Sequence, residues 1–173
     1  MITVFDIETS FQVIDGKSDP SPKHPENFIV SIGINDEYFF FKHSQYNGAI
    51  YKKEVQDILD KTTLLIGHNI KFDLQWLLEC GFAYDGAVYD TMVVEYLMAG
   101  GIKCDLTLDG CCRRREIKRP EKDLVSDYMN KGIDFHSIPW GIVKKYGIAD
   151  IEATKSLSDY QIGLLKTSYK EFL

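Results

Sequence analysis

Two carboxylates stand close together near the start of the chain, in the run VFDIETS at residues 4–10. Residues 2–8 are rich in apolar and β-branched residues, which predicts a strand. Because side chains alternate along a strand, Asp6 and Glu8 then point to the same face. Two like charges on one buried face are costly without a partner, and Mg²⁺ or Mn²⁺ is the partner that suits carboxylate oxygens best. An ordinary strand with a solvated acidic face is the simpler alternative.

A third carboxylate lies in the run GHNIKFDLQWL at residues 67–77. Residues 63–69 form a short apolar run that predicts a buried strand, and residues 72–80, followed by Gly81, predict a helix. Asp73 then lies in the first turn of that helix, at the edge of the sheet where sites occur in open α/β folds. The alternative is that Asp73 only interacts favourably with the N-terminal dipole of its helix.

A tyrosine and a fourth carboxylate occur in the run YGIADIEATKSL at residues 146–157. Tyr146 and Asp150 are four residues apart, so they share one face of a helix. This spacing is also compatible with a helix on which Tyr146 packs and Asp150 is solvated.

Taken in order, these three runs resemble the motifs of the DEDD superfamily of 3′–5′ exonucleases, in the branch with tyrosine in its third motif. The first motif is FDIET, the second HNIKFD and the third YGIAD. The flanking runs YDTMVVEYLMAG (89–100) and ADIEATKSL (149–157) look like those of the proofreading domain of family A DNA polymerases. The matched positions are Asp6, Glu8, Asn69, Phe72, Asp73, Tyr146 and Asp150.

The resemblance implies an α/β chain with a ribonuclease H-like fold, in which helices flank a mixed central sheet whose first three strands are antiparallel. It implies one exonuclease domain over residues 1–173. It further implies two divalent cations, Mg²⁺ or Mn²⁺, about 4 Å apart, that clamp the attacking and leaving oxygens of an in-line displacement. The expected reaction is hydrolysis at DNA 3′ ends with release of nucleoside 5′-monophosphates, in proofreading or DNA processing.

The same resemblance assigns roles to individual residues. Asp6 would bridge both ions, Glu8 and Asp150 would complete the protein ligands of the first, and Asp73 would hold the second largely through water. Tyr146 would help Glu8 to orient the attacking water. The residues expected to contact the terminal nucleotide are Thr9, His68, Asn69 and Phe72, with local hydrogen bonding the alternative for His68 and core packing for Phe72.

Composition limits the other possibilities. The chain of 173 residues is 45% hydrophobic, which suits one compact core, and its formal net charge is −6. Proteins that bind nucleic acid mainly by neutralising phosphates are usually basic, so the negative charge fits an enzyme whose positive charge comes from metal ions. The basic run RRREIKR (113–119) is open to two interpretations, a solvated face or a set of phosphate contacts.

The expected partners are single-stranded DNA or DNA 3′ ends. RNA, as in trimming enzymes like ribonuclease D, is the main alternative substrate, and a separately encoded polymerase is a further candidate partner. An inactive nuclease fold used to bind nucleic acid is the rival from another functional class. We expect no membrane association and a cytoplasmic location, because no apolar run approaches about 20 residues and no signal peptide is recognised. The cysteines lack zinc-site spacing, so we expect reduced thiols.

The remaining patterns predict the order of elements. Residues 28–35 and 37–43 read as a hairpin with a tight turn, and residues 11–27, rich in Pro and Gly, as a loop. Residues 49–60 and 89–101 read as helices. Residues 139–172 read as two helices with a break near Gly147.

Overall fold

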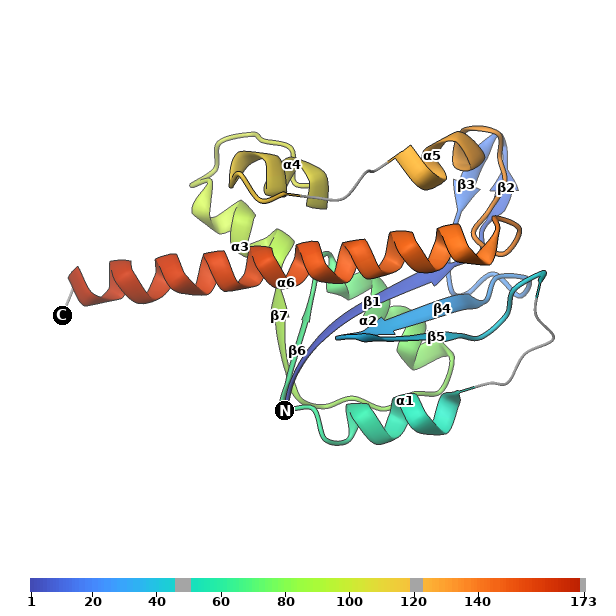
Figure 1. The fold of residues 1–173 in the computed structure, drawn as a ribbon, viewed down its shortest axis with the longest axis horizontal. Coiled ribbons are helices and arrows are strands. Elements are labelled where there is room, and N and C mark those ends of the chain that lie inside the picture. The colour runs from blue at the N-terminus through green and yellow to red at the C-terminus, as the bar shows by residue number, and fades with distance from the viewer. Residues whose placement is uncertain (46–50, 119–122, 172–173) are drawn as a thin grey trace.

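A five-stranded mixed sheet forms the centre of the computed structural model, which describes residues 1–45, 51–118 and 123–171 (Figure 1). The strand order is β5-β4-β1-β6-β7. Strands β1, β4 and β5 pair antiparallel, whereas β6 and β7 run parallel to β1. The strands are β1 (Ile2–Thr9), β4 (Ile29–Ile34), β5 (Glu37–Phe40), β6 (Leu64–Gly67) and β7 (Ala87–Asp90). The mixed sheet and its three antiparallel strands agree with the sequence-based expectation.

Helices cover both faces of this sheet. The helices are α1 (Lys52–Leu59), α2 (Ile70–Glu79), α3 (Thr91–Met98), α4 (Leu108–Arg114), α5 (Asp123–Asn130) and α6 (Trp140–Glu171). Figure 1 shows α6 lying across the sheet, with α1 on the opposite side and the end of α6 continuing past α3 and α4. In the described ranges, no helix combines the length and the apolar composition that a bilayer-spanning segment needs.

The alternation of β1 places its apolar and acidic residues on different faces. Phe5 and Ile7 are buried in a core with side chains from α1 and α2. Val4 points the other way, into a smaller cluster with Ile66 and with Ile151 of α6. The two acidic residues that follow at every second position share the face of Val4, so they point toward α6.

Helix α6 is continuous over 32 residues, so the expected break near Gly147 is wrong. A Cβ atom at residue 147 would overlap the side chain of Tyr38 on β5. The glycine therefore serves a close approach between helix and sheet, and it does not end the helix. A glycine inside a helix costs about 1 kcal/mol relative to alanine. This cost is small compared with the free energy that a helix of this length gains by packing on the sheet.

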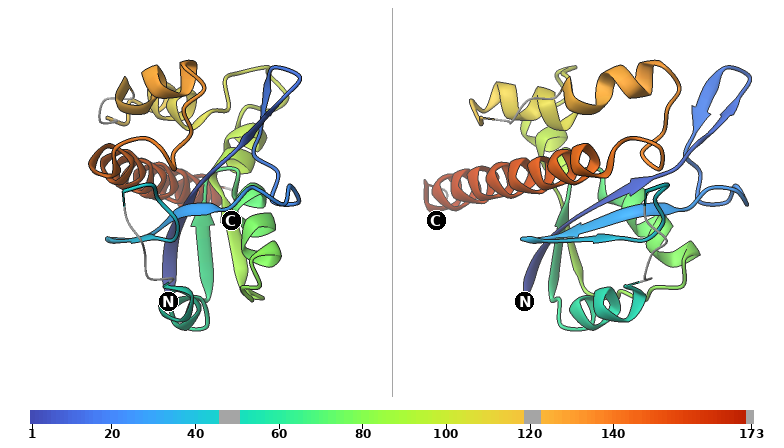
Figure 2. Two further views of the ribbon diagram at one scale, coloured as in Figure 1. Left: turned by 90° about the vertical axis from the view of Figure 1, so that its right-hand side faces the viewer. Right: turned by 45° about the vertical axis from the view of Figure 1, so that its right-hand side comes forward.

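The expected loop at residues 11–27 contains a hairpin of two short strands, β2 (Gln12–Ile14) and β3 (Lys17–Asp19). Its turn residues, Asp15 and Gly16, both have positive φ angles, 51° and 75°. An Asp-Gly turn of this kind matches the twist of paired strands. The strands were missed because they have three residues each and little burial pattern, and Figure 2 shows the hairpin standing out from the central sheet.

The expected helix at residues 89–101 is preceded by a strand. Asp90 ends β7 and also caps α3, because its side chain accepts hydrogen bonds from the backbone N–H groups of Met92 and Val93. The strand is exposed on much of its surface, so the sequence lacks the apolar run by which parallel strands are recognised.

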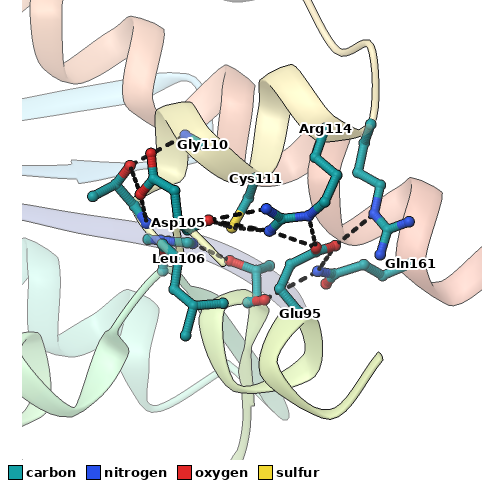
Figure 3. A network of polar contacts seen from close by, with 11 residues as sticks. Glu95, Asp105, Leu106, Gly110, Cys111, Arg114 and Gln161 are labelled. Atoms are coloured by element: carbon teal, nitrogen blue, oxygen red, sulfur yellow. Dashed lines mark hydrogen bonds and ion pairs between the residues drawn. The ribbon is translucent and has the colours of Figure 1, made fainter. Parts of the chain in front are cut away.

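A buried carboxylate joins α3, α4 and α6 (Figure 3). The side chain of Glu95 on α3 is fully buried. Its Oε2 accepts hydrogen bonds from Arg114 at 3.1 and 3.3 Å, and its Oε1 accepts from Arg115 at 3.0 Å and from Gln161 of α6 at 3.1 Å. Arg114 and Arg115 of the basic run thus form ion pairs with a buried carboxylate while their own side chains stay partly exposed, a contact that neither interpretation of the run predicted. Arg113 and Lys118 are exposed, and Arg119 lies outside the described residues.

We predict that Glu95→Gln destabilises the protein by about 3 kcal/mol. This is the lower end for breaking a buried ion pair, because both guanidinium groups are partly exposed and can be hydrated. Burial raises the pKa of Glu95, but hydrogen bonds from Arg115, Gln161 and Arg114 outweigh this, so its pKa lies below the ordinary 4.5. The difference in the free energy of unfolding between wild type and variant should therefore be largest above pH 4.5. It should shrink as the pH falls through the lowered pKa of Glu95.

Urea denaturation of wild type and variant across this pH range measures both effects. The matched control is Asp57→Asn, which breaks the exposed pair with Lys53 on α1 and should leave stability at the wild-type value. Equal stability of Glu95→Gln and the control would contradict a clamping role for Glu95.

Candidate active site

Three carboxylates from two elements converge on the face of the sheet covered by α6. Oxygen atoms of Asp6, Glu8 and Asp150 all lie within 4.8 Å of one another. Asp6 and Glu8 come from β1, and Asp150 comes from α6. Glu8 and Asp150 are buried, with 7% and 9% of their surface exposed, and Asp6 is half-buried. Hard oxygen donors gathered at this spacing fit the coordination of Mg²⁺ or Mn²⁺.

The pairing of β1 with β4 is irregular directly beside this cluster. Glu8 pairs with Ser31 of β4, but the next residue, Thr9, pairs with Ile29, so the register shifts between Glu8 and Thr9 and leaves Val30 as an extra residue on β4. An extra residue of this kind bends the strand that carries it. Thr9 is buried at the end of β1, adjacent in sequence to the cluster, where the chain leaves the sheet for the β2–β3 hairpin.

The fourth carboxylate, Asp73, reaches the site from the first turn of α2. Strands β1 and β6 pair only from Ile2 to Val4. Beyond that point the backbone N–H of Ile7 donates to Asp73 Oδ1 at 3.1 Å instead. Burial and then the charge of Asp6 raise the pKa of Asp73 well above its ordinary value, although hydrogen bonds from backbone N–H groups oppose the shift. Asp73 is therefore held next to Asp6 by the backbone of the strand that carries Asp6.

The turn between β6 and α2 holds two of the residues expected at the terminal nucleotide. Asn69 adopts a left-handed conformation, with φ 58°, and its exposed side chain does not cap α2. The backbone N–H of Asn69 donates to Asp90 Oδ1 at 3.0 Å. The side chain of Asn69 is thus available at the carboxyl end of β6.

His68 is engaged within the protein at both ring nitrogens. Nδ1 lies 2.9 Å from the hydroxyl oxygen of Thr91, and Nε2 lies 2.9 Å from the carbonyl oxygen of Leu106. The Thr91 hydroxyl also donates to the carbonyl of Gly67 at 3.1 Å. These contacts join the end of β6 to α3 and to the segment before α4, which favours the local role over nucleotide contact.

Two aromatic residues expected at the site are half-buried. Phe72 packs against the core between the sheet and α1 and α2. Tyr146 lies one helical turn before Asp150 on α6, and its ring centroid is 5.7 Å from that of Phe135. The structure thus brings the helix face of Tyr146 and Asp150 to the carboxylates, and it gives Tyr146 a packing contact.

A second tyrosine, Tyr38 of β5, was not identified from the sequence. Its hydroxyl lies 2.9 Å from the hydroxyl oxygen of Ser31. Burial raises the pKa of Tyr38 most, and the charges of Glu8, Asp6 and Asp150 raise it further, in that order. Tyr38 pairs with Gly33, and Gly33 pairs with Asp6, so the Tyr38 side chain lies on the face of the sheet that carries the carboxylates. Aromatic residues are common in strands, so nothing in the sequence singles out Tyr38. Its place near the carboxylates follows only from the pairing of β5 with β4 and of β4 with β1.

No protein-family model matches this chain, and no curated protein matches it. Among solved structures, it is similar to an exonuclease X in complex with 5′-overhanging duplex DNA. The identity is 17%, the TM-score is 0.45, and the match covers 91% of this chain and 90% of that one. A likeness this distant carries no inference about activity.

We predict that Asp73→Asn stabilises the metal-free protein at neutral pH, by about 1 kcal/mol, because it removes a charge from a buried position and keeps the acceptor for Ile7. The pKa of Asp73 is raised above the ordinary 3.8, so the wild type loses stability as the pH rises from 3.8 toward the raised value. The variant lacks this loss, and its advantage should grow over the same range.

Thermal melts in excess chelator between pH 4 and 8 measure this difference. Adding Mn²⁺ should reverse the order, because ligand binding to the folded state stabilises the protein with more intact ligands. A constant difference across the pH range would show that the charge of Asp73 is not the cause.

Proposed function

We propose that this protein is a metal-dependent 3′–5′ exonuclease that hydrolyses phosphodiester bonds at DNA 3′ ends and releases nucleoside 5′-monophosphates. The observation that carries the proposal is the convergence of Asp6, Glu8 and Asp150, with Asp73 buried beside Asp6. Four acidic groups so placed repel one another, and a phosphodiester anion could not approach them without cations. The four positions are also those of the exonuclease motifs read from the sequence.

We further propose that the fold is ribonuclease H-like and that residues 1–173 form one exonuclease domain. Support comes from the mixed sheet with three antiparallel strands and from the helices on both of its faces. In this arrangement β1 is central, and its neighbours bring the remaining site residues to it.

In the proposed mechanism, two Mg²⁺ or Mn²⁺ ions would supply charge neutralisation and a water of lowered pKa. Asp6, Glu8 and Asp150 would hold one ion, and Asp73 would bind the other together with Asp6. Glu8 would accept a hydrogen bond from the attacking water, and the hydroxyl of Tyr146 would help to fix its direction. Each of these groups acts by orientation and charge, so no covalent intermediate with the protein is required.

The terminal nucleotide would lie over the carboxyl ends of β1 and β6. Asn69 has an exposed side chain there. We propose that Thr9 at the end of β1 and Phe72 in the first turn of α2 contact the nucleotide as well. Single-stranded DNA or a frayed 3′ end is the proposed substrate, because a terminal nucleotide must leave its base pair to enter such a site. RNA is the alternative substrate, and a nucleic-acid-binding protein without activity is the rival function.

We predict cleavage of 5′-labelled single-stranded DNA from its 3′ end in Mg²⁺ or Mn²⁺, and loss of cleavage in excess chelator. Asp6→Ala should abolish it, because Asp6 is proposed to contact both ions. Asp57→Asn, on the exposed surface of α1, is the matched carboxylate control and should keep wild-type activity. A ladder of shortened products resolved on a gel, compared on DNA and RNA of one sequence, gives polarity and preference. Cleavage that persists in chelator would refute the proposal.

Tyr146→Phe tests the role of the hydroxyl separately from packing. The change keeps the ring contact with Phe135, so the fold should be unaffected. If the hydroxyl orients the attacking water, single-turnover cleavage should slow by about 10²-fold or less, with little change in DNA affinity. The loss should be milder than for any of the four carboxylates. Wild-type cleavage rates at saturating Mg²⁺ would make Tyr146 a packing residue.

A further inference from the structure

Tyr38 and Ser31 occupy the same face of the sheet as the acidic residues of β1. Asp6 pairs with Gly33 of β4, and Gly33 pairs with Tyr38 of β5, so these three residues form one row across three strands. Two residues further along β1, in the next row on the same face, Glu8 pairs with Ser31. Paired residues on neighbouring strands point to the same side of a sheet. The two hydroxyl side chains thus lie beside the two carboxylates, under α6.

The ring of Tyr38 lies in space that two glycines leave open. A Cβ atom at Gly33 would come within 3.2 Å of the Tyr38 ring and 2.7 Å of the Ile151 side chain of α6. A Cβ atom at Gly147 of α6 would overlap the ring and hydroxyl of Tyr38. Trp140 contacts the ring as well, with centroids 5.7 Å apart. The tyrosine is therefore built into the junction of sheet and helix, and its hydroxyl is placed by packing.

The two hydroxyl groups can share one hydrogen bond and still offer another. Tyr38 and Ser31 lie 2.9 Å apart, and either can be the donor. Each hydroxyl has one proton, so whichever proton is not used in the shared bond remains for a neighbouring acceptor. Glu8 pairs with Ser31 in the register of β1 and β4, so its carboxylate is the acceptor best placed for that second proton.

We propose that Tyr38, together with Ser31, is a positioning residue of the carboxylate site, holding Glu8 by a hydrogen bond in the orientation needed to bind a divalent cation. The inference rests on the proposed function, because it concerns the same site. Tyr38 acts through Glu8 and does not contact the reacting atoms. This role differs from that of Tyr146, which lies on α6 and is proposed to act on water.

The test is Tyr38→Phe, which removes the hydroxyl and keeps the ring in its packing site. Mn²⁺ affinity, measured by isothermal titration calorimetry on protein without DNA, should fall by about 10-fold, the lower end for losing a hydrogen bond to a metal ligand. The Mn²⁺ concentration that gives half-maximal cleavage should rise by a similar factor, while KM for DNA at saturating Mn²⁺ stays at the wild-type value. The thermal midpoint in chelator should change little.

Ser31→Ala is the second variant and should weaken Mn²⁺ binding in the same direction. The double variant should bind about as weakly as the weaker single variant, because groups in one hydrogen-bond network are not additive. If Tyr38→Phe folds poorly, the Mn²⁺ affinity of Ser31→Ala decides whether the hydroxyl pair positions Glu8. The matched control is Tyr84→Phe. Tyr84 lies in the connection before β7, and its hydroxyl donates to the carbonyl of Ala87 at 2.7 Å. This variant should bind Mn²⁺ as the wild type does.

Wild-type Mn²⁺ affinity in both Tyr38→Phe and Ser31→Ala would overturn the positioning role and leave the exonuclease proposal standing. Equal weakening in Tyr84→Phe would overturn it as well, by showing a general effect on stability. A wild-type protein that binds Mn²⁺ but does not cleave nucleic acid would refute the exonuclease proposal, and the calorimetric comparison would still decide the role of Tyr38.

Discussion

Mutual repulsion among four carboxylates is the constraint on which the rest of this structure depends. Asp6, Glu8 and Asp150 have oxygens within 4.8 Å, and Asp73 carries a raised pKa partly because Asp6 is near. Such a cluster destabilises the metal-free fold, so other interactions must hold it together. Apolar packing on both faces of β1 does this, with Phe5 and Ile7 on one side and Val4 on the other. The residues that surround the acidic pair thus anchor the strand that carries it.

The closeness of α6 to the sheet follows from the same requirement. Asp150 can meet Asp6 and Glu8 only if the helix lies nearly in contact with β1 and β4. Gly33 allows this approach on the sheet, since any side chain there would strike Ile151. Gly147 allows it on the helix, where Tyr38 fills the space. Gly147, which suggested a helix break from the sequence alone, is therefore a packing position in the folded protein.

Local patterns predicted the parts of the fold that depend on local physics. The strand of Asp6, the hairpin turning after Ile34 and helix α2 each follow from neighbouring residues, although α2 begins at Ile70, two residues before the expected start. The turn at Asp15 and Gly16 carried a hairpin signal, but strands of three residues gave it no support. The place of Tyr38 beside the site depends on strand register. The arginine partners of Glu95 are 19 and 20 residues away along the chain. Neither is encoded in a local pattern. The motif residues of the site could be predicted from the sequence because each motif is short and contiguous.

The position of α6 along its own axis is fixed at two places, and this links the buried ion network to the carboxylate site. Gln161 follows Asp150 by 11 residues, close to three helical turns of 3.6 residues, so both side chains lie on one face of α6. Gln161 donates to Glu95 and to the carbonyl of Thr91, whose hydroxyl contacts His68 at the start of the second motif. Toward the start of the helix, Gly147 fits against Tyr38. A helix held at both points cannot slide by a turn, and so the oxygen atoms of Asp150 stay within reach of β1.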